Sequence, residues 1–411
     1  MMRNFLMMIL MVILWFDGLT VYGLFPTGAA ILNVFKITSV LALFFYVIFF
    51  RHQIDKKDFL LCLAFIPLWW IYSGEDNPVV AGMKIISRFI PLYGFILIDR
   101  DSKYKILSAW FTFYTLTLFP GIIIHVLKLV FSIPFPINEF TDFQGKQYDS
   151  HFFIYFYNRW NYIRFCGIYN EPGVIGTYSF LMLLFFSHYL SRFQKVVIWS
   201  SGLLSLSFFF FGTIPFILAI RLLLKRKYLK LTMSTFFLVG LLAITPMLID
   251  QILKANNKSS VYNDLIFHTI KNRFNISEGS NSITSIKTNR LNTDNYTFNE
   301  FKKEDVVTIL FGNFFTLGAK KFNQITGSGL GIELNFYQYG LLYTLYNIFL
   351  IGLIVLLPAR NKLLHGLLLF LALLICYYQR PYLYRIEFLS LMYIGVIEFR
   401  KFAIKPKLMD N

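Results

Sequence analysis

The feature that most constrains this chain is a series of long apolar stretches, which recurs from its first residues almost to its last. Of 411 residues, 56% are hydrophobic and only 15% are charged, whereas about a quarter of a soluble domain is charged. A helix needs about 20 apolar residues to cross the hydrocarbon core of a bilayer. The sequence therefore predicts an all-α polytopic membrane protein. The predicted spans lie near 5–25, 30–50, 59–74, 79–98, 106–131, 173–190, 231–253, 340–357, 363–378 and 382–399.

One further apolar stretch, 196–224, is too long for a single ordinary span. It contains Gly212 and Pro215 near its centre and has basic residues on both flanks. Glycine and proline both favour a break in a helix. We therefore expect a hairpin of two short helices that turns at 212–215, which gives about 12 transmembrane helices in all.

The net charge of +17 would indicate nucleic acid as the partner of a soluble protein, but here most basic residues lie beside the ends of apolar stretches. Loops on the cytoplasmic side of a membrane are enriched in Lys and Arg. With a cytoplasmic N-terminus, alternate loops carry nearly all of these residues, and Arg380 is the single one in the short loops on the other side. This distribution predicts that both termini are cytoplasmic, and it favours membrane lipid over nucleic acid as the surroundings of the basic residues.

Two long polar segments, 134–172 and 254–339, then fall outside the cytoplasm. Long connections without regular structure are uncommon unless they are functional. The second segment becomes apolar again over 305–318, which predicts a helix at the membrane surface. We therefore expect a single membrane domain over 1–411 with two large external loops, and chemistry on the external side.

The cysteines form no pattern that is typical of a metal or disulfide site. Cys62, Cys166 and Cys376 are far apart in the sequence, and no CxxC pair is present. The histidines show no ligand spacing either. The sequence predicts neither a bound metal nor a cofactor.

The most specific short string closes the first long loop, from Arg159 through Arg164 and Gly167 to Glu171-Pro172-Gly173. It resembles the pattern shared by O-antigen polymerases of the Wzy type and O-antigen ligases, in which an arginine precedes a Pro-Gly start of a helix. A guanidinium offers a planar set of donors to phosphate oxygens, and a helix N-terminus adds a positive dipole. The alternative for both arginines is an interfacial position, with the charge reaching lipid headgroups.

A second resemblance closes the other long loop, where Gly312 follows an apolar run and a Gly-rich turn leads to Tyr339-Gly340-Leu341. Arg290 lies roughly where this family carries an arginine early in the loop. The ligases usually carry a histidine pair near the place of Glu333 and Asn335, and this sequence has none. The departure favours a polymerase over a ligase.

Charges within predicted spans are a third group, because an ionisable side chain in a bilayer costs several kcal/mol and marks function by default. Lys84 and Arg88 are four residues apart, on one face of a helix. They would contact an anionic substrate or pair with an acidic residue such as Asp17, Asp250 or Glu387. For Lys36 and Lys128 we expect side chains that reach toward a membrane interface.

A carboxylate or histidine is needed to take the proton of an acceptor hydroxyl. Glu333 and Glu171 rank first because each lies beside a predicted helix start near one of the two strings. For Glu171 the competing role is to complement the dipole of the following helix. The other candidates on the external side are Glu75, Asp76, Asp142, Asp149, His151 and His268.

The resemblance implies an enzyme of the bacterial inner membrane, a glycosyltransferase that joins undecaprenyl-pyrophosphate-linked oligosaccharide repeats into O-antigen or capsular polysaccharide at the periplasmic face. A chain-length regulator and a flippase are the partners that it implies. In this interpretation Arg164 and Arg290 stabilise the pyrophosphate leaving group, Lys84, Arg88, Arg159 and Glu171 bind substrate, and Glu333 is the base. The alternatives are an O-antigen ligase, a lipid-linked oligosaccharide flippase or transporter, and a non-enzymatic scaffold of an export complex.

Overall fold

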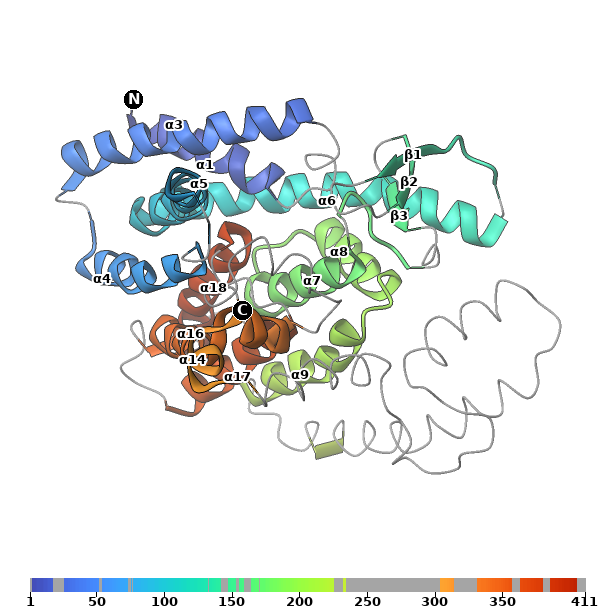
Figure 1. Ribbon diagram of the computed structural model, residues 1–411. Coiled ribbons are helices and arrows are strands. Elements are labelled where there is room, and N and C mark those ends of the chain that lie inside the picture. The colour runs from blue at the N-terminus through green and yellow to red at the C-terminus, as the bar shows by residue number, and fades with distance from the viewer. Residues whose placement is uncertain are drawn as a thin grey trace.

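The computed structural model describes a mostly helical chain (Figure 1). The described residues are 2–17, 26–51, 54–72, 75, 77–131, 133–141, 147–152, 155–158, 164–169, 171–224, 232–233, 304–313, 331–356, 363–379 and 385–404. The helices are α1 (Met2–Phe16), α3 (Pro26–Phe50), α4 (Lys56–Phe65), the 3-10 helix η2 (Ile66–Tyr72), α5 (Pro78–Leu97), α6 (Arg100–Phe131), α7 (Pro172–Phe186), α8 (Arg192–Leu204), α9 (Phe208–Leu224), α14 (Val306–Phe311), α16 (Gly331–Leu356), α17 (Leu363–Gln379) and α18 (Ile386–Ile404).

Four of these helices are long and apolar enough to cross a membrane: α3, α5, α6 and α16. Three shorter apolar stretches lie in α1, α7 and α17. The prediction of a helical membrane protein is confirmed at this level, and the number of crossings stays a prediction. Of the predicted span 231–253, only 232–233 are among the described residues.

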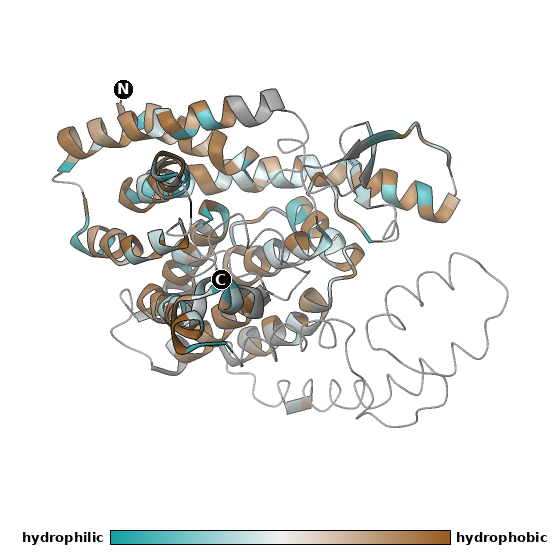
Figure 2. Cartoon of the chain, viewed as in Figure 1, coloured by the Kyte–Doolittle hydropathy of each residue, from teal (hydrophilic) through white to brown (hydrophobic). Residues whose placement is uncertain are grey.

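The outward face of α3 shows why a bilayer is the right solvent. Its exposed side chains include Ile31, Val34, Leu41, Phe44 and Phe49, and Figure 2 shows the helix as largely hydrophobic. Soluble monomers rarely expose an apolar surface that is continuous over such a length, whereas lipid chains cover it without cost.

The helices pack into two groups that share α18. Around α1 lie α3, α5 and α6, while α7 lies between α8 and α9 and also packs against α18. α18 in turn contacts α5 and α16, and α16 packs against α14 and α17. α18 therefore connects the N-terminal helices with the C-terminal ones (Figure 1).

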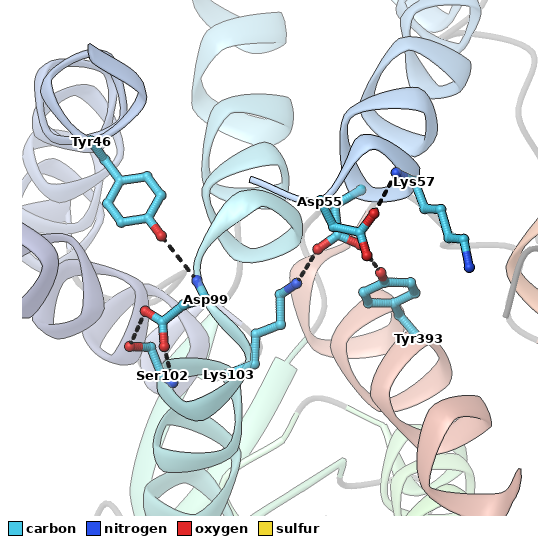
Figure 3. Close-up of polar contacts among 8 residues, drawn as sticks. Tyr46, Asp55, Lys57, Asp99, Ser102, Lys103 and Tyr393 are labelled. Carbon is cyan, nitrogen blue, oxygen red and sulfur yellow. Dashed lines mark hydrogen bonds and ion pairs between the residues drawn. The ribbon is translucent and has the colours of Figure 1, made fainter. Parts of the chain in front are cut away.

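One end of the bundle is held by buried polar contacts, which we call the basic end. Lys103 Nζ lies 2.6 Å from Asp58 Oδ2, and the Tyr393 hydroxyl donates to the same carboxylate. These residues come from α6, α4 and α18, and Figure 3 shows Lys103 and Tyr393 pointing toward each other near the start of α4. Beside them the backbone N–H of Asp99 donates to Tyr46 Oη over 3.1 Å. The loops around 51–57 and 99–105, which the sequence assigns to one side of the membrane, therefore lie at the same end of the bundle.

Glu398 extends this basic end toward the corner between α7 and α8. The hydroxyl of Tyr189 donates to Glu398 Oε2 over 2.7 Å, and the hydroxyl of Tyr104 donates to Oε1. His188 Nε2 lies 3.6 Å from the same carboxylate. A buried carboxylate needs such donors to offset the loss of water.

The stretch 196–224 forms two helices, as expected, but the turn is not where we expected it. The chain breaks at 205–207, where Leu206 has a φ of 45°, and α9 continues through Gly212 and Pro215. A Cβ on Gly176 of α7 would lie 2.8 Å from Ser207 Cβ. The turn therefore forms where small residues let it approach α7, and proline by itself does not end α9.

The first long loop contains a three-stranded antiparallel sheet that the sequence pattern did not predict. Its strands are β1 (Asn138–Thr141), β2 (Gln147–His151) and β3 (Tyr155–Asn158), in the order β1-β2-β3. Asp149 pairs with Glu139 on one side and with Tyr157 on the other. The sheet packs on the last turns of α6, which extend past the neighbouring helices (Figure 1).

The second string of the sequence coincides with a crossing of two backbones. Gly312 follows α14 with a φ of 85°, and Gly340 interrupts α16 with a φ of 82°. A Cβ on Gly312 would lie 2.3 Å from the carbonyl oxygen of Gln338, and one on Gly340 would lie 2.3 Å from that of Leu310. Only glycine permits both the positive φ and this approach. The two glycines thus fasten α14 to the first part of α16.

Candidate functional site

We call the string that closes the first long loop the Arg164 string. Its residues 164–169 are buried, and Arg164 lies at the joint between α8 and α9. Arg164 is 7% exposed, and its Nε donates to the carbonyl oxygen of Ser205 over 3.2 Å. The adjacent N–H of Phe165 donates to the carbonyl oxygen of Leu204 over 3.0 Å. These carbonyls lie at the C-terminal end of α8, where no further N–H group of the helix is available to donate to them. Arg164 therefore has a structural role here, in addition to any contact with a substrate.

Gly167 brings the same segment against α6 and the sheet. Its carbonyl oxygen accepts from the N–H of Phe156 over 2.7 Å, and its φ is 56°. A Cβ at this position would lie 2.6 Å from Leu118 Cδ2. The glycine three residues after Arg164 is therefore required by close packing.

Glu171 is the N-cap residue of α7, and its side chain makes no capping hydrogen bond. Pro172 follows at the first helical position, where the missing N–H costs nothing. The start of α7 therefore keeps backbone N–H groups and a positive dipole end beside the Arg164 segment. This geometry is compatible with either of the two roles that the sequence left open for Glu171.

A group of charged residues lies deeper in the bundle, and we call it the inner charge cluster: Asp17, Lys36, Arg88, Arg385 and Glu387. Lys36 Nζ pairs with Asp17 Oδ1, and the two side chains are 8% and 20% exposed. The expectation that Lys36 reaches toward an interface is wrong, because its partner lies at the end of α1 and the pair is buried together. The charges of Arg385 and Arg88 also act on Asp17.

The inner charge cluster meets α18 at its first turn, because Glu387 is the second residue of this helix. At a rise of about 1.5 Å per residue, roughly 17 Å of helix separates Glu387 from Glu398 at the basic end. With three cations and two carboxylates, the cluster has an excess of positive charge when all five are ionised.

Lys84 and Arg88, which share a face of α5, have different surroundings. Lys84 pairs with Glu75, and the side chains are 45% and 13% exposed. Arg88 belongs to the inner charge cluster. Internal pairing, one of the two roles considered for these cations, is thus present for Lys84, and it also engages Glu75, a candidate base.

Glu387 is a candidate functional residue whose environment the sequence did not predict. It is 1% exposed, and neither carboxylate oxygen has a hydrogen-bond partner among the residues that the structure describes. The charges of Asp17, Arg385 and Lys36 act on it. The sequence named Glu387 as a counter-ion, since an acidic residue within a predicted span is a signal of function, but no pattern showed that it is left without a donor.

The remaining candidates divide into two groups. Asp149 and His151 are buried in β2, where His151 Nδ1 contacts the carbonyl oxygen of Pro136 over 2.8 Å. Arg159, Arg290, Asp76, Asp142 and His268 lie outside the described residues, as does the side chain of Glu333 in α16. No cluster of three or more His, Cys, Asp or Glu side chains with metal-binding geometry occurs in the part of the chain that is described.

The class of protein is thus a mostly helical membrane protein with a small antiparallel sheet. Comparison with known proteins adds nothing more specific: no family model, no curated protein and no solved structure matches the chain.

Proposed function

We propose that this chain is a polysaccharide polymerase of the bacterial inner membrane. It joins undecaprenyl-pyrophosphate-linked oligosaccharide repeats at the periplasmic face, and its termini are cytoplasmic. The observation that carries the proposal is the position of the Arg164 string. Residues 164–169 of this string, which resembles the polymerase pattern, are buried close to the start of α7, and α7 packs against α18, whose first turn contains Glu387.

The reaction is a glycosyl transfer that needs no nucleotide sugar. The hydroxyl oxygen of an acceptor repeat attacks the anomeric carbon of the growing glycan, and the bond from that carbon to the pyrophosphate oxygen breaks. The electron pair leaves with the lipid pyrophosphate, while the hydroxyl proton passes to a base. Cations near the leaving oxygen stabilise its developing charge, which is the role proposed for Arg164 and Arg290, with Arg159, Lys84 and Arg88 contributing to binding.

The test begins with deletion of the gene in its own strain and with the banding pattern of the surface polysaccharide. We expect the ladder to collapse to core plus one repeat and to return with the plasmid-borne gene. Long lipid-linked glycan with bare core would identify a ligase instead. An unchanged ladder, or a loss of all repeats from the outer face, would contradict polymerase activity, and the second result would favour a flippase.

A set of arginine variants then tests the site. Arg164→Ala should abolish polymer, and Arg164→Lys should restore little of it, because lysine keeps the charge but loses the planar donors. Arg192→Ala is the control, since Arg192 is exposed at the basic end. Membrane levels of each variant must be matched, because Arg164 also contacts the Ser205 carbonyl. Long chains at a normal level of Arg164→Ala would exclude the role assigned to Arg164.

A further inference from the structure

Two buried polar groups lie close to the start of α18, the carboxylate of Glu387 itself and a tyrosine hydroxyl of α7. Both oxygens of Glu387 lack a hydrogen-bond partner in the described part of the chain, and the same holds for the hydroxyl of Tyr178 on α7. Burying a polar group without a hydrogen-bond partner costs free energy, and an unpartnered carboxylate costs more than a neutral group. Native proteins satisfy nearly all such groups. Several neutral side chains in the described part of the chain also have a buried atom without a partner, but Glu387 is the one acidic side chain among them. Its carboxylate therefore indicates that a bound group provides the donors.

Tyr178 connects Glu387 to the segment that carries the Arg164 string. The ring of Phe388, which follows Glu387, lies 5.0 Å from the ring of Tyr178. Tyr178 also contacts the ring of Tyr169 at 5.7 Å, and the charge of Glu387 acts on both phenols. The start of α18 therefore lies beside the middle of α7, near Tyr169 of the segment that follows Arg164.

The neighbouring charges limit what could bind there. Lys36 and Arg385 lie close to Glu387, so an added metal cation would be repelled. An anion would meet the carboxylates of Glu387 and Asp17. A neutral group that donates hydrogen bonds fits best, since a carboxylate is an acceptor only and a phenol can accept as well. A sugar hydroxyl is such a group.

From this geometry we infer that Glu387 is the catalytic base of the transfer, and that Tyr178 helps to hold the acceptor sugar. This inference rests on the proposed function and replaces Glu333 in the role of base. The acceptor hydroxyl donates to a Glu387 oxygen, its proton moves to the carboxylate as the new glycosidic bond forms, and the pyrophosphate leaves with the electron pair. Because Glu387 is 1% exposed, side chains around the start of α18 must shift when the acceptor enters.

A matched control lies in the same helix. Glu398 is also a buried carboxylate of α18, but tyrosine hydroxyls from α6 and from the turn between α7 and α8 donate to it at the basic end. Replacing either glutamate by glutamine removes one buried carboxylate with almost no change in volume. Only Glu387→Gln removes the proposed base.

The experiment uses full-length protein in liposomes, with the single-repeat lipid extracted from the deletion strain as substrate. We expect Glu387→Gln to slow polymer formation by about 100-fold or more, the usual scale for loss of a general base. Glu387→Asp should retain an intermediate rate, because it keeps a carboxylate. Glu398→Gln, at equal folded protein, should stay within about threefold of the wild type, a small difference on that scale.

The outcomes separate the two proposals. If the wild type forms polymer and Glu387→Gln does so at a similar rate, Glu387 is not the base, although the polymerase proposal stands. Equal inactivity of Glu387→Gln and Glu387→Asp, together with lowered thermal midpoints for both, would also overturn the inference by showing a structural role. A wild type that forms no polymer from this lipid contradicts the proposed function itself.

Discussion

At the scale of single residues, His151 shows how the stability of the three-stranded sheet depends on protonation. Because a carbonyl oxygen can only accept, the contact with Pro136 requires hydrogen on Nδ1. The other nitrogen, Nε2, then accepts from Lys128 Nζ at 3.3 Å, which requires a neutral ring. Burial, together with the charge of Lys128, lowers the pKa of His151 below its ordinary value of 6.5.

This lowered pKa predicts a loss of stability in acid. The folded sheet holds His151 neutral, whereas the unfolded segment takes up a proton below about pH 6.5. The stabilisation is therefore complete above that pH and decreases as the pH falls, by at most about 1.4 kcal/mol per pH unit for one proton. The hydrogen-exchange protection factors of 147–158, which compare each amide with its intrinsic rate at the same pH, should fall between pH 7.5 and 5.5, and His151→Gln should weaken this dependence. Equal pH dependence in the two proteins would contradict the prediction.

At the scale of elements, the crossing of α14 and α16 predicts a strong asymmetry between glycines. Gly312→Ala and Gly340→Ala each place a Cβ 2.3 Å from a carbonyl oxygen and strain a positive φ. Such strain alone costs about 1–3 kcal/mol, so we expect either variant to lose most of its folded, detergent-stable protein. Gly82→Ala in α5 is the control, since nothing lies within 4 Å of its added Cβ. Size-exclusion chromatography with heating measures both, and normal midpoints for the first two would argue against the crossing.

The same elements show what a sequence discloses and what it does not. Hydropathy predicted the long apolar helices α3, α5, α6 and α16 because a helix needs about 20 apolar residues to cross a membrane. The sheet was missed because its strands, such as Asn138–Thr141, are short and carry no alternating pattern. The hairpin turn was misplaced because Gly212 and Pro215 are the usual helix breakers, whereas the turn formed where Gly176 leaves room for Ser207.

The candidate site was predictable to a lesser degree, since its partners are distant in sequence. An arginine before a Pro-Gly helix start was recognised as a site, but the contact of Arg164 with Ser205 joins residues 41 positions apart. Lys36 could not be matched to Asp17 without the packing of α1 on α3. The absence of a donor for Glu387 is likewise a property of the folded bundle.

At the scale of the whole molecule, the basic end predicts a sidedness that can be measured. Single cysteines at Lys57 and Arg192, both exposed there, should react with a membrane-impermeant maleimide only after cells are permeabilised. Glu139 and Glu304 are exposed in the two long loops that we predict to be external, so cysteines at these positions should react in intact spheroplasts. The native cysteines are buried, so the background should be low. Labelling of Lys57→Cys from outside would reverse the topology.

The contacts of Asp58 also bear on how the protein is made. Its lysine partner follows 45 residues later, but its tyrosine partner follows 335 residues later. Ribosomes add residues in order, so this corner of the bundle has an ion pair early in synthesis and gains its last hydrogen bond only when α18 emerges. The basic end therefore stays incomplete while most of the chain is synthesised. α18 completes the packing of helices that were synthesised long before it.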